Sequence, residues 1–405
     1  MAGIMPLDDV RVIDLTQGAM GPFCTRVLAD YGADVIKIEP PGAGDPARML
    51  PPFLADEPGP ERSGLFLFLN TSKRSVTLDV TRPRGRELLL QLVRGAQVVV
   101  ESFKPGALAQ LGLDYATLHA ANPQLVLTSI TNFGQHGPYA QFEAESLTAY
   151  AMGGAMLQAG DVDHEPLKTA GRMAEYQAGL SAALATSLAL LGAERRGAGE
   201  HLDVSLFETA THSIDQRLGR LLGYEHGGHV GTRTGLASMV GSGVYPAADG
   251  FFFFTAGVQY ITQMIRMIGH EELFEQPEWA TAEARAHPDR IAEFPQYLLP
   301  WSVSRTMTEI RDACQEFGVL GGPLNTIPAL LADPSFVERK FFQQIDHPVV
   351  GPQTYPGYHF TLHRDEPMPP RRHAPLLGAH TEAVLCGELR LGAAELAELR
   401  REGVV

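Results

Sequence analysis

The stretches Val10-Arg-Val-Ile-Asp-Leu15 and Asp34-Val-Ile-Lys-Ile-Glu39 decide the fold class of this chain. Each is short, largely apolar and predicts a β-strand. Between them, Gly18–Pro22 predicts a turn and Phe23–Tyr31 predicts a short helix. A strand, a helix and a second strand form a βαβ unit, whose right-handed crossover makes the two strands parallel. The opening of the chain therefore predicts a parallel sheet.

Further strands and helices alternate along the next 170 residues or so, as in a doubly wound α/β domain. The segment Gln17-Gly-Ala-Met-Gly21 lacks the spacing Gly-x-Gly-x-x-Gly, which argues against NAD as a ligand. The remaining predicted strands are Ser75–Val80, Gln97–Glu101, Leu125–Ile130 and His201–Leu206, and Pro83 opens a crossover helix through Arg94.

The length of 405 residues predicts two or three domains. The composition changes near Tyr224, where the glycine-rich stretch Glu225–Gly243 begins, and Phe251–Phe254 predicts a buried strand. We expect Thr232–Gly243 to form a mobile lid, because glycines permit large backbone changes. The predicted boundaries are 1–223 for a large domain, 224–334 for a small α/β domain, and 335–405 for a carboxyl-terminal segment.

The segment Lys168–Leu191 begins in a loop that contains Gly171 and then predicts a long helix. Its leucines at 180, 184, 188 and 191 follow helical spacing, so we expect this face to be buried deep in the protein. Glu175 lies in the first turn, where free backbone N–H groups and the helix dipole favour an ionised carboxylate. Two interpretations of Glu175 remain open: a nucleophile or base, or a residue that only stabilises the helix end.

Composition excludes several classes of function. A net charge of −15 argues against a nucleic-acid partner. The cysteines at 24, 314 and 386 form neither a disulfide framework nor a zinc pattern, and His-Glu-x-x-His and Cys-x-x-Cys are absent, so no metal site is expected. We see no apolar run of about 18 residues and no signal-like amino terminus, so we expect a cytoplasmic protein without a membrane partner.

Basic residues at strand ends offer candidate contacts for a phosphorylated ligand, because ligands of open α/β sheets bind at the carboxyl ends of strands. Taken one residue at a time, a solvated surface charge is the more common explanation of such a side chain. They are Lys73, Arg74, Arg82, Arg84 and Lys104.

Many collinear motifs resemble the family III CoA-transferases of the CaiB/BaiF type, which include formyl-CoA transferase-like and α-methylacyl-CoA racemase-like members. The resemblance runs nearly end to end. The motifs are Val12-Ile-Asp-Leu-Thr16, Leu28–Glu39, Asn70–Ser75, Glu101-Ser-Phe-Lys-Pro-Gly106, Phe133–Tyr139, His201–Leu206, Gly243-Val-Tyr-Pro246, Gly322–Thr326, Asp346-His-Pro348 and Leu377–Thr381.

This resemblance implies a large Rossmann-like domain, a small domain, and a carboxyl-terminal segment that returns to the large domain. It also implies an interlocked homodimer. The implied reaction moves CoA from an acyl-CoA to a carboxylic acid through an anhydride and an enzyme–CoA thioester. CoA is then a substrate, and no permanently bound cofactor is expected.

The family's nucleophilic Asp aligns with Glu175 in this sequence, so a longer carboxylate takes its place. The racemases have a His-Asp pair where this chain has Glu145 and Ser146, which weighs against a racemase. Alternatives to a self-sufficient transferase are therefore a racemase or isomerase, and a non-catalytic subunit of a heteromer.

The resemblance also implies contacts with CoA. Leu78 and Phe103 match family positions that line the CoA site, and Ala107 matches a small residue beside the pantetheine. Ala19 stands at a family CoA position where formyl-CoA transferase-like members have Gln, and Ser102 and Gln110 also depart from the family residues. Arg82 and Lys104 are expected near the nucleotide phosphates, and Lys73 and Arg74 are further phosphate candidates.

Overall fold

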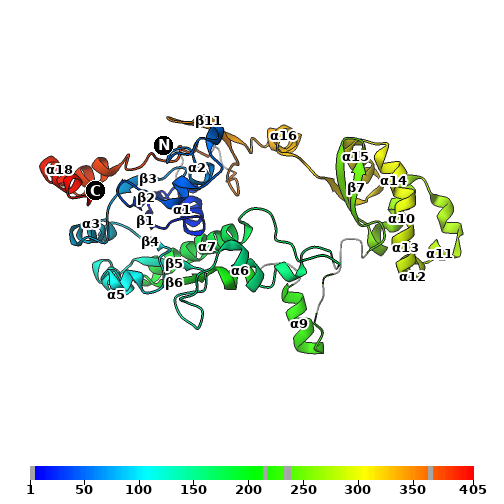
Figure 1. Cartoon of the computed structure of the whole chain (residues 1–405), viewed down its shortest axis with the longest axis horizontal. Helices are drawn as coiled ribbons and strands as arrows, with labels where there is room; N and C mark the ends of the chain where they lie inside the picture. Colours follow the sequence, from blue (N-terminus) through cyan, green and yellow to red (C-terminus); the bar gives the residue numbers. More distant parts are fainter. Residues whose placement is uncertain (1–4, 162, 213–216, 231–232, 234–238, 364–367) are drawn as a thin grey trace. The chain divides into compact units, whose positions relative to one another are not determined.

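The computed structural model describes residues 5–161, 163–212, 217–230, 233, 239–363 and 368–405, with the side chains of 217–220 left out (Figure 1). The chain divides into two compact units. Unit 1 contains residues 1–156, 168–228 and 340–405, and unit 2 contains 157–167 and 229–339. The carboxyl-terminal segment thus belongs to the same unit as the amino-terminal half. Whether the units fold independently, as the domain boundaries expected from the sequence imply, stays a prediction.

Unit 1 is built on a six-stranded sheet of order β3-β2-β1-β4-β5-β6, with every pair parallel. The predicted α/β fold with a parallel sheet is confirmed. The chain adds β2 and β3 on one side of β1, then crosses to add β4, β5 and β6 on the other. The order therefore reverses between β1 and β4, which is the usual binding position in such sheets. The strands are β1 Arg11–Leu15, β2 Asp34–Glu39, β3 Arg74–Thr77, β4 Val98–Glu101, β5 Val126–Thr131 and β6 His201–Ser205.

Helices cover both faces of this sheet, and each face has its own apolar core (Figure 1). Helices α1 and α7 pack on one face, while α3, α5 and α18 pack on the other. The longer helices of unit 1 are α1 Met20–Asp30, α3 Pro83–Arg94, α5 Tyr115–Ala121, α7 Met173–Arg196, α9 Arg217–Gly227 and α18 Ala393–Arg401; the shorter are α2 Gly64–Leu69, α4 Ala107–Gln110, α6 Ser146–Met152 and α8 Leu206–Thr211.

The carboxyl-terminal segment is tied to the strand β3. The backbone N–H of His380 donates to the carbonyl of Ser75 at 2.9 Å, and that of Asp79 donates to Val404 at 2.8 Å. These bonds cover the outer edge of the sheet, which would otherwise present unpaired backbone groups. The segment also contains the hairpin β10 Gln343–His347 and β11 Gly351–Tyr355.

Unit 2 holds the antiparallel sheet β7-β8-β9 with helices packed on it. Phe252 and Phe254 are buried, whereas Phe251 is exposed, so the phenylalanine run alternates rather than being buried throughout. Much of the predicted lid Thr232–Gly243 lies outside the described residues. The elements are β7 Gly243–Ala247, β8 Gly250–Thr255, β9 Leu320–Pro323, α10 Gly257–Ile268, α11 Pro277–Ala280, α12 Ala282–Arg285, α13 Pro288–Glu293, α14 Pro295–Val303, α15 Met307–Phe317, α16 Ile327–Ala332 and α17 Pro334–Glu338.

Helix α7 corrects one expectation, because its leucine face is not buried. Leu180, Leu184, Leu188 and Leu191 are 45%, 62%, 60% and 52% exposed. The buried face consists of small residues instead. They are Ala174, Ala178, Gly179, Ala182, Ala183, Thr186, Ala189 and Ala193. The physical reason is distance: small side chains let α7 approach α1 and the sheet more closely than leucines would.

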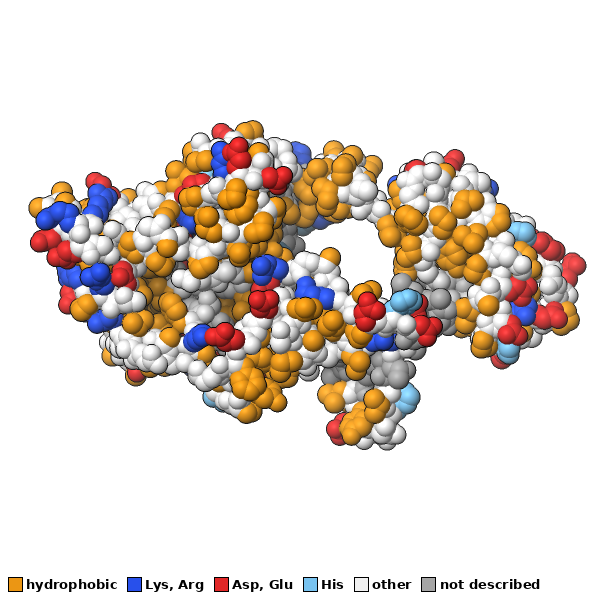
Figure 2. Space-filling view, in the orientation of Figure 1, with side chains coloured by type: hydrophobic (Ala, Val, Ile, Leu, Met, Phe, Trp, Pro, Cys, Tyr) orange, Lys and Arg blue, Asp and Glu red, His pale blue; other side chains and the backbone are white. Residues whose placement is uncertain are grey.

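The apolar length of α7 also bears on the membrane expectation. By length and composition alone, this 24-residue helix could cross a bilayer, with 39% of its most apolar window buried in the protein. Core helices of soluble proteins meet the same criterion, and the packing of its small-residue face on the sheet is compatible with a soluble protein. Figure 2 shows further hydrophobic side chains on the visible face of α9.

Candidate active site

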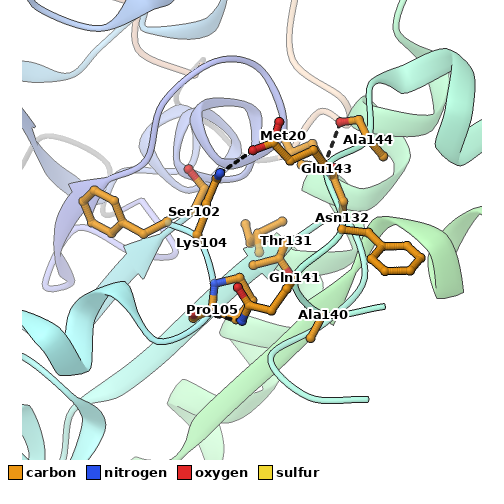
Figure 3. A pocket seen from close by; sticks show the side chains of 13 residues that line it. Met20, Ser102, Lys104, Pro105, Thr131, Asn132, Ala140, Gln141, Glu143 and Ala144 are labelled. Carbon is orange, nitrogen blue, oxygen red and sulfur yellow. Dashed lines mark hydrogen bonds and ion pairs between the residues drawn. The ribbon is translucent and has the colours of Figure 1, made fainter. Parts of the chain in front are cut away.

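A cavity of about 310 Å³ lies in unit 1 at the point where the strand order reverses (Figure 3). One wall is the loop that follows β4, from Ser102 to Pro105, and the opposite wall is the segment Ala140–Ala144. The floor is the end of β5 with Asn132, and Met20 of α1 closes one side. The carboxyl ends of β4 and β5 therefore open into the cavity, where a parallel sheet is expected to bind its ligand.

Side-chain hydrogen bonds fix both walls. The hydroxyl of Ser102 accepts from the backbone N–H of Gln17 at 3.1 Å, which joins the loops after β1 and β4. The carboxylate of Glu101 accepts from the N–H of Phe103 at 2.7 Å. Across the cavity, the side-chain amide of Asn132 donates to the carbonyl of Ala144 at 2.8 Å. The polypeptide around the cavity is thus pinned at several points.

Lys104 and Glu143 form an ion pair between the two walls (Figure 3). Both side chains are well exposed, at 73% and 78%. The hydrogen bond from Lys104 lowers the pKa of Glu143. Exposed ion pairs are weak and exchange readily with solvent, so this pair can open to admit a ligand.

Glu175 occupies the third position of α7, with its side chain only 12% exposed. One terminal nitrogen of Arg172 donates to both carboxylate oxygens, at 3.0 Å each. The ordinary reason for an acidic residue here is the set of free N–H groups at the helix start. The carboxylate therefore lies in the first turn of the helix and is held by a guanidinium.

Met20 connects the first turns of α7 to the cavity. It lines the cavity and also packs against a small cluster that contains Ala174 and Ala178 of α7. The two helices meet closely because position 179 is glycine: a Cβ there would lie 2.5 Å from the carbonyl oxygen of Met20. The first turns of α7, which carry Glu175, thus pack against a residue that also lines the cavity.

A fully buried ionic network underlies the same end of the sheet. The ammonium of Lys73 donates to Asp14 at 3.0 Å, to Thr25 and Asn70 at 2.8 Å, and to the carbonyl of Pro22. Burial alone would raise the pKa of Asp14, but Lys73, Lys37 and two threonine hydroxyls outweigh it and lower the pKa to about 2. Burial lowers the pKa of Lys73 to about 8, because Asp14 offsets the desolvation only in part. This network fixes the loop between β1 and α1.

The structure brings four of the predicted CoA contacts to this region. Phe103 and Lys104 line the cavity, and Ala19 is the buried residue directly before Met20. Ala107 begins α4, directly after Gly106, whose φ of +87° allows the tight turn. Gly106 and Lys104 also line a smaller neighbouring cavity of about 100 Å³.

The other predicted contacts have different surroundings. Lys73 is 2% exposed and already surrounded by acceptors, which favours a structural role over contact with a phosphate. Arg74 begins β3, at the amino edge of the sheet, where it pairs with Asp34 and Glu388. The cavity lies at the opposite, carboxyl edge, so the geometry also favours a structural role for Arg74.

Leu78 and Arg82 both follow the carboxyl end of β3. Leu78 is buried in the core beneath α3, and its N–H donates to the carbonyl of Glu39 at 2.8 Å. Arg82 is 55% exposed, with Asp79 at 3.4 Å, and it does not line the cavity. A phosphate contact at Arg82 therefore requires a ligand that extends along the carboxyl edge of the sheet.

Sequence reasoning missed two residues that the structure brings to the site. Arg172 lies three residues before Glu175, a spacing that places charges together on a helix and that could have identified it. Glu143 meets Lys104 only through the folded loops, so no local pattern signals it. Among the described residues, no group of three His, Cys, Asp or Glu side chains is placed to hold a metal ion.

The fold and site define an α/β protein with a binding cavity at the switch point of a doubly wound sheet and a buried carboxylate in the first turn of a helix that packs on the same face. The profile of CoA-transferase family III matches residues 7–381, and the chain belongs to this family. It is an acyl-CoA:carboxylate CoA-transferase, as the curated relatives are.

One of the most similar relatives is the succinyl-CoA–D-citramalate CoA-transferase of Chloroflexus aurantiacus, 34% identical, covering 85% of each chain. Another is the BbsE subunit of succinyl-CoA:(R)-benzylsuccinate CoA-transferase from Thauera aromatica, 32% identical over 98% of this chain and 97% of the relative. A solved CaiB/BaiF family protein from Brucella suis superposes with a TM-score of 0.82, at 31% identity, covering 95% of this chain and all of that one.

Proposed function

We propose that this chain transfers CoA between an acyl-CoA and a carboxylic acid, with Glu175 as the nucleophile. The observation that carries the proposal is a buried carboxylate in the first turn of α7, a turn whose Ala174 and Ala178 belong to the cluster on which the cavity residue Met20 packs. One nitrogen of Arg172 donates to both oxygens of this carboxylate, and a carboxylate oxygen can act as a nucleophile toward a thioester.

The proposed reaction has two balanced halves. An oxygen of Glu175 attacks the thioester carbonyl of the donor, the carbon–sulfur bond breaks, and an anhydride and CoA thiolate form. The thiolate then attacks the carbonyl carbon of Glu175, which releases the donor's acid and leaves an enzyme–CoA thioester. The acceptor acid reverses both steps. Because the thioester retains the activation energy, no ATP is consumed.

We place CoA in the cavity beside Phe103 and Lys104, with Ala19 and Ala107 next to it. The support is their position at the carboxyl edge of the sheet. Arg82 lies on the same edge, two strands from β1, and a long ligand such as CoA spans strand spacings of about 4.8 Å each. The acids named for the two curated relatives each carry two carboxyl groups, so we propose dicarboxylic acids as the first substrates to test.

The assembly that we propose is an interlocked homodimer. The support is the open leucine face of α7, since an extended exposed apolar surface usually marks an association site. A second candidate is a heteromer with a homologous chain, which is favoured by the similarity to BbsE, a subunit by its name.

The decisive experiment compares the wild type with Glu175→Gln and Glu175→Asp. An amide has nearly the same size but is a very poor nucleophile, so Glu175→Gln should lower transfer roughly a thousandfold or more while CoA binding persists. Glu175→Asp withdraws the carboxylate by about 1 Å, and we expect a loss of about a hundredfold. Full transfer activity of purified Glu175→Gln would refute the nucleophile.

Trapping identifies the intermediate and separates the two assemblies. The protein is incubated alone with succinyl-CoA and other acyl-CoA donors, then with hydroxylamine, and peptides are analysed by mass spectrometry. A hydroxamate at Glu175 supports catalysis by this chain itself. A modified carboxylate that appears only on a homologous partner would favour the heteromer.

A further inference from the structure

The carboxylate of Glu175 has one charged partner among the described residues, and that partner is the more exposed of the two. Arg172 is 40% exposed, whereas the carboxylate that it covers is 12% exposed. The guanidinium is therefore the more accessible member of the pair, and an acid that comes from solvent can contact it. Among the described residues, only one terminal nitrogen of Arg172 has hydrogen-bond partners, so its other N–H groups are free to bind an anion.

The approach to Glu175 carries more positive than negative charge. Lys168 folds back onto its own loop, where its ammonium donates to the carbonyls of Thr169 and Gly171. Within 168–175, Lys168 and Arg172 are the basic side chains and Glu175 is the acidic one. Once Glu175 is esterified, this segment retains two cations and no anion.

Resting on the proposed function, we propose that Arg172 binds whichever carboxylate is free during the reaction. In the resting enzyme that carboxylate is Glu175. In the enzyme–CoA thioester, Glu175 is neutral and the free carboxylate is that of the leaving or incoming acid. The ion pair exchanges one carboxylate for the other, and no covalent bond forms or breaks in this exchange.

The geometry fits this exchange. Attack on the acyl carbon of Glu175 requires the acid's oxygen to come within about 3–3.5 Å of it. The guanidinium nitrogen lies 3.0 Å from both Glu175 oxygens, so it reaches a carboxylate at the attacking position. A planar guanidinium also presents parallel N–H groups that match both oxygens of a carboxylate. Arg172 thereby positions the acceptor for attack.

The test separates acid binding from thioester formation. In Arg172→Gln, the KM for the acid should rise about 10- to 100-fold, the range expected for losing a hydrogen bond to a charged group. The KM for acyl-CoA should change little, and hydroxylamine should still trap Glu175 with acyl-CoA in the absence of acid. Arg172→Lys keeps the charge without the paired geometry. Its KM for the acid should lie between those of the wild type and Arg172→Gln. Added guanidinium ion should partly restore the acid KM of Arg172→Gln.

Arg196→Gln is the matched control, because Arg196 forms a similar pair with Glu200 at the far end of α7. It should leave both KM values unchanged. An unchanged acid KM in Arg172→Gln, or loss of trapping at Glu175 in that variant, would overturn this role. Absence of trapping in the wild type would instead refute the proposed nucleophile, so the two failures are distinguishable. Equal thermal unfolding of the variants excludes a general loss of stability.

Discussion

The two faces of α7 use apolar residues in opposite ways. The inner face carries alanines and Gly179, and it packs so closely on α1 that a methyl group at position 179 would overlap the carbonyl of Met20. The outer face carries the larger apolar side chains, and these are about half exposed. The small residues thus make the close packing within the chain, whereas the leucines remain exposed and available to contact another surface. Burial within one chain does not follow from hydrophobicity alone.

The same contrast exists between two lysines. Lys73 is buried and surrounded by Asp14, Thr25 and Asn70, whereas Lys104 is exposed and meets a single exposed carboxylate, Glu143. The first arrangement holds the loop between β1 and α1. The second borders the cavity and can exchange partners. A substitution in the buried network around Lys73 should therefore disturb stability, whereas one in the exposed pair of Lys104 and Glu143 should disturb ligand binding.

The largest effect is expected from substitutions on the exposed leucine face of α7, and it should be on the dimer dissociation constant. Replacing Leu184 and Leu188 together by Asp places two charges where we propose the partner chain binds, and should raise the dimer dissociation constant roughly a thousandfold, about 4 kcal/mol. Sedimentation velocity measures the association. The Leu184→Met, Leu188→Met double variant conserves apolar volume and should remain dimeric. An Asp variant that still dimerises would show that this face is not the interface.

Substitutions on the inner, small-residue face of α7 should change the free energy of unfolding of the chain. Gly179→Ala should destabilise by about 2 kcal/mol, because the new methyl meets backbone at 2.5 Å and α1 must shift. Gly192→Ala is the matched control on the same helix, since its methyl would meet only the flexible end of Arg196. That change should be neutral or stabilise by up to about 1 kcal/mol. Denaturant unfolding measures both, and equal effects would contradict the comparison.

These differences mark where sequence reasoning succeeds. The alternation of short apolar strands and helices predicted the parallel sheet, because a βαβ crossover has one favoured hand. The position of Glu175 at a helix start followed from its place before the apolar run. The orientation of α7 did not follow, because helical periodicity identifies an apolar stripe without saying whether the same chain covers it.

The candidate ligand contacts illustrate a second limit. Lys73 and Lys104 look alike in sequence, as basic residues at the ends of strands, yet one is 2% exposed and the other's side chain is 73% exposed. Their difference depends on Asp14 and Glu143, which lie 59 and 39 residues away along the chain. Pairings over such separations are set by the tertiary fold, and a single sequence does not reveal them.

The closed ionic network should be visible in the acid stability of the protein. The folded pKa of Asp14 is about 2, below its ordinary 3.8, so its contribution is present above pH 3.8 and is lost as the pH falls toward 2. The linked free energy is about 2 kcal/mol. In Asp14→Asn, the loss of unfolding free energy between pH 4 and pH 2 should be smaller by that amount. Equal slopes in wild type and variant, measured by urea unfolding, would contradict this prediction.

The smallest effect is expected at the open pair of Lys104 and Glu143. If Lys104 contacts a phosphate of CoA, Lys104→Ala should raise the KM for acyl-CoA about 3- to 10-fold, while kcat stays the same. Glu143→Gln removes the competing carboxylate and should lower that KM a few-fold. Both effects should shrink in about 0.5 M salt, because exposed charges are strongly screened there. Arg196→Ala is a control of equal charge change at the far end of α7, for which we expect the acyl-CoA KM to remain near the wild-type value. If Lys104→Ala leaves this KM unchanged at low salt, the phosphate contact is wrong, and Lys104 serves only to join the two walls of the cavity.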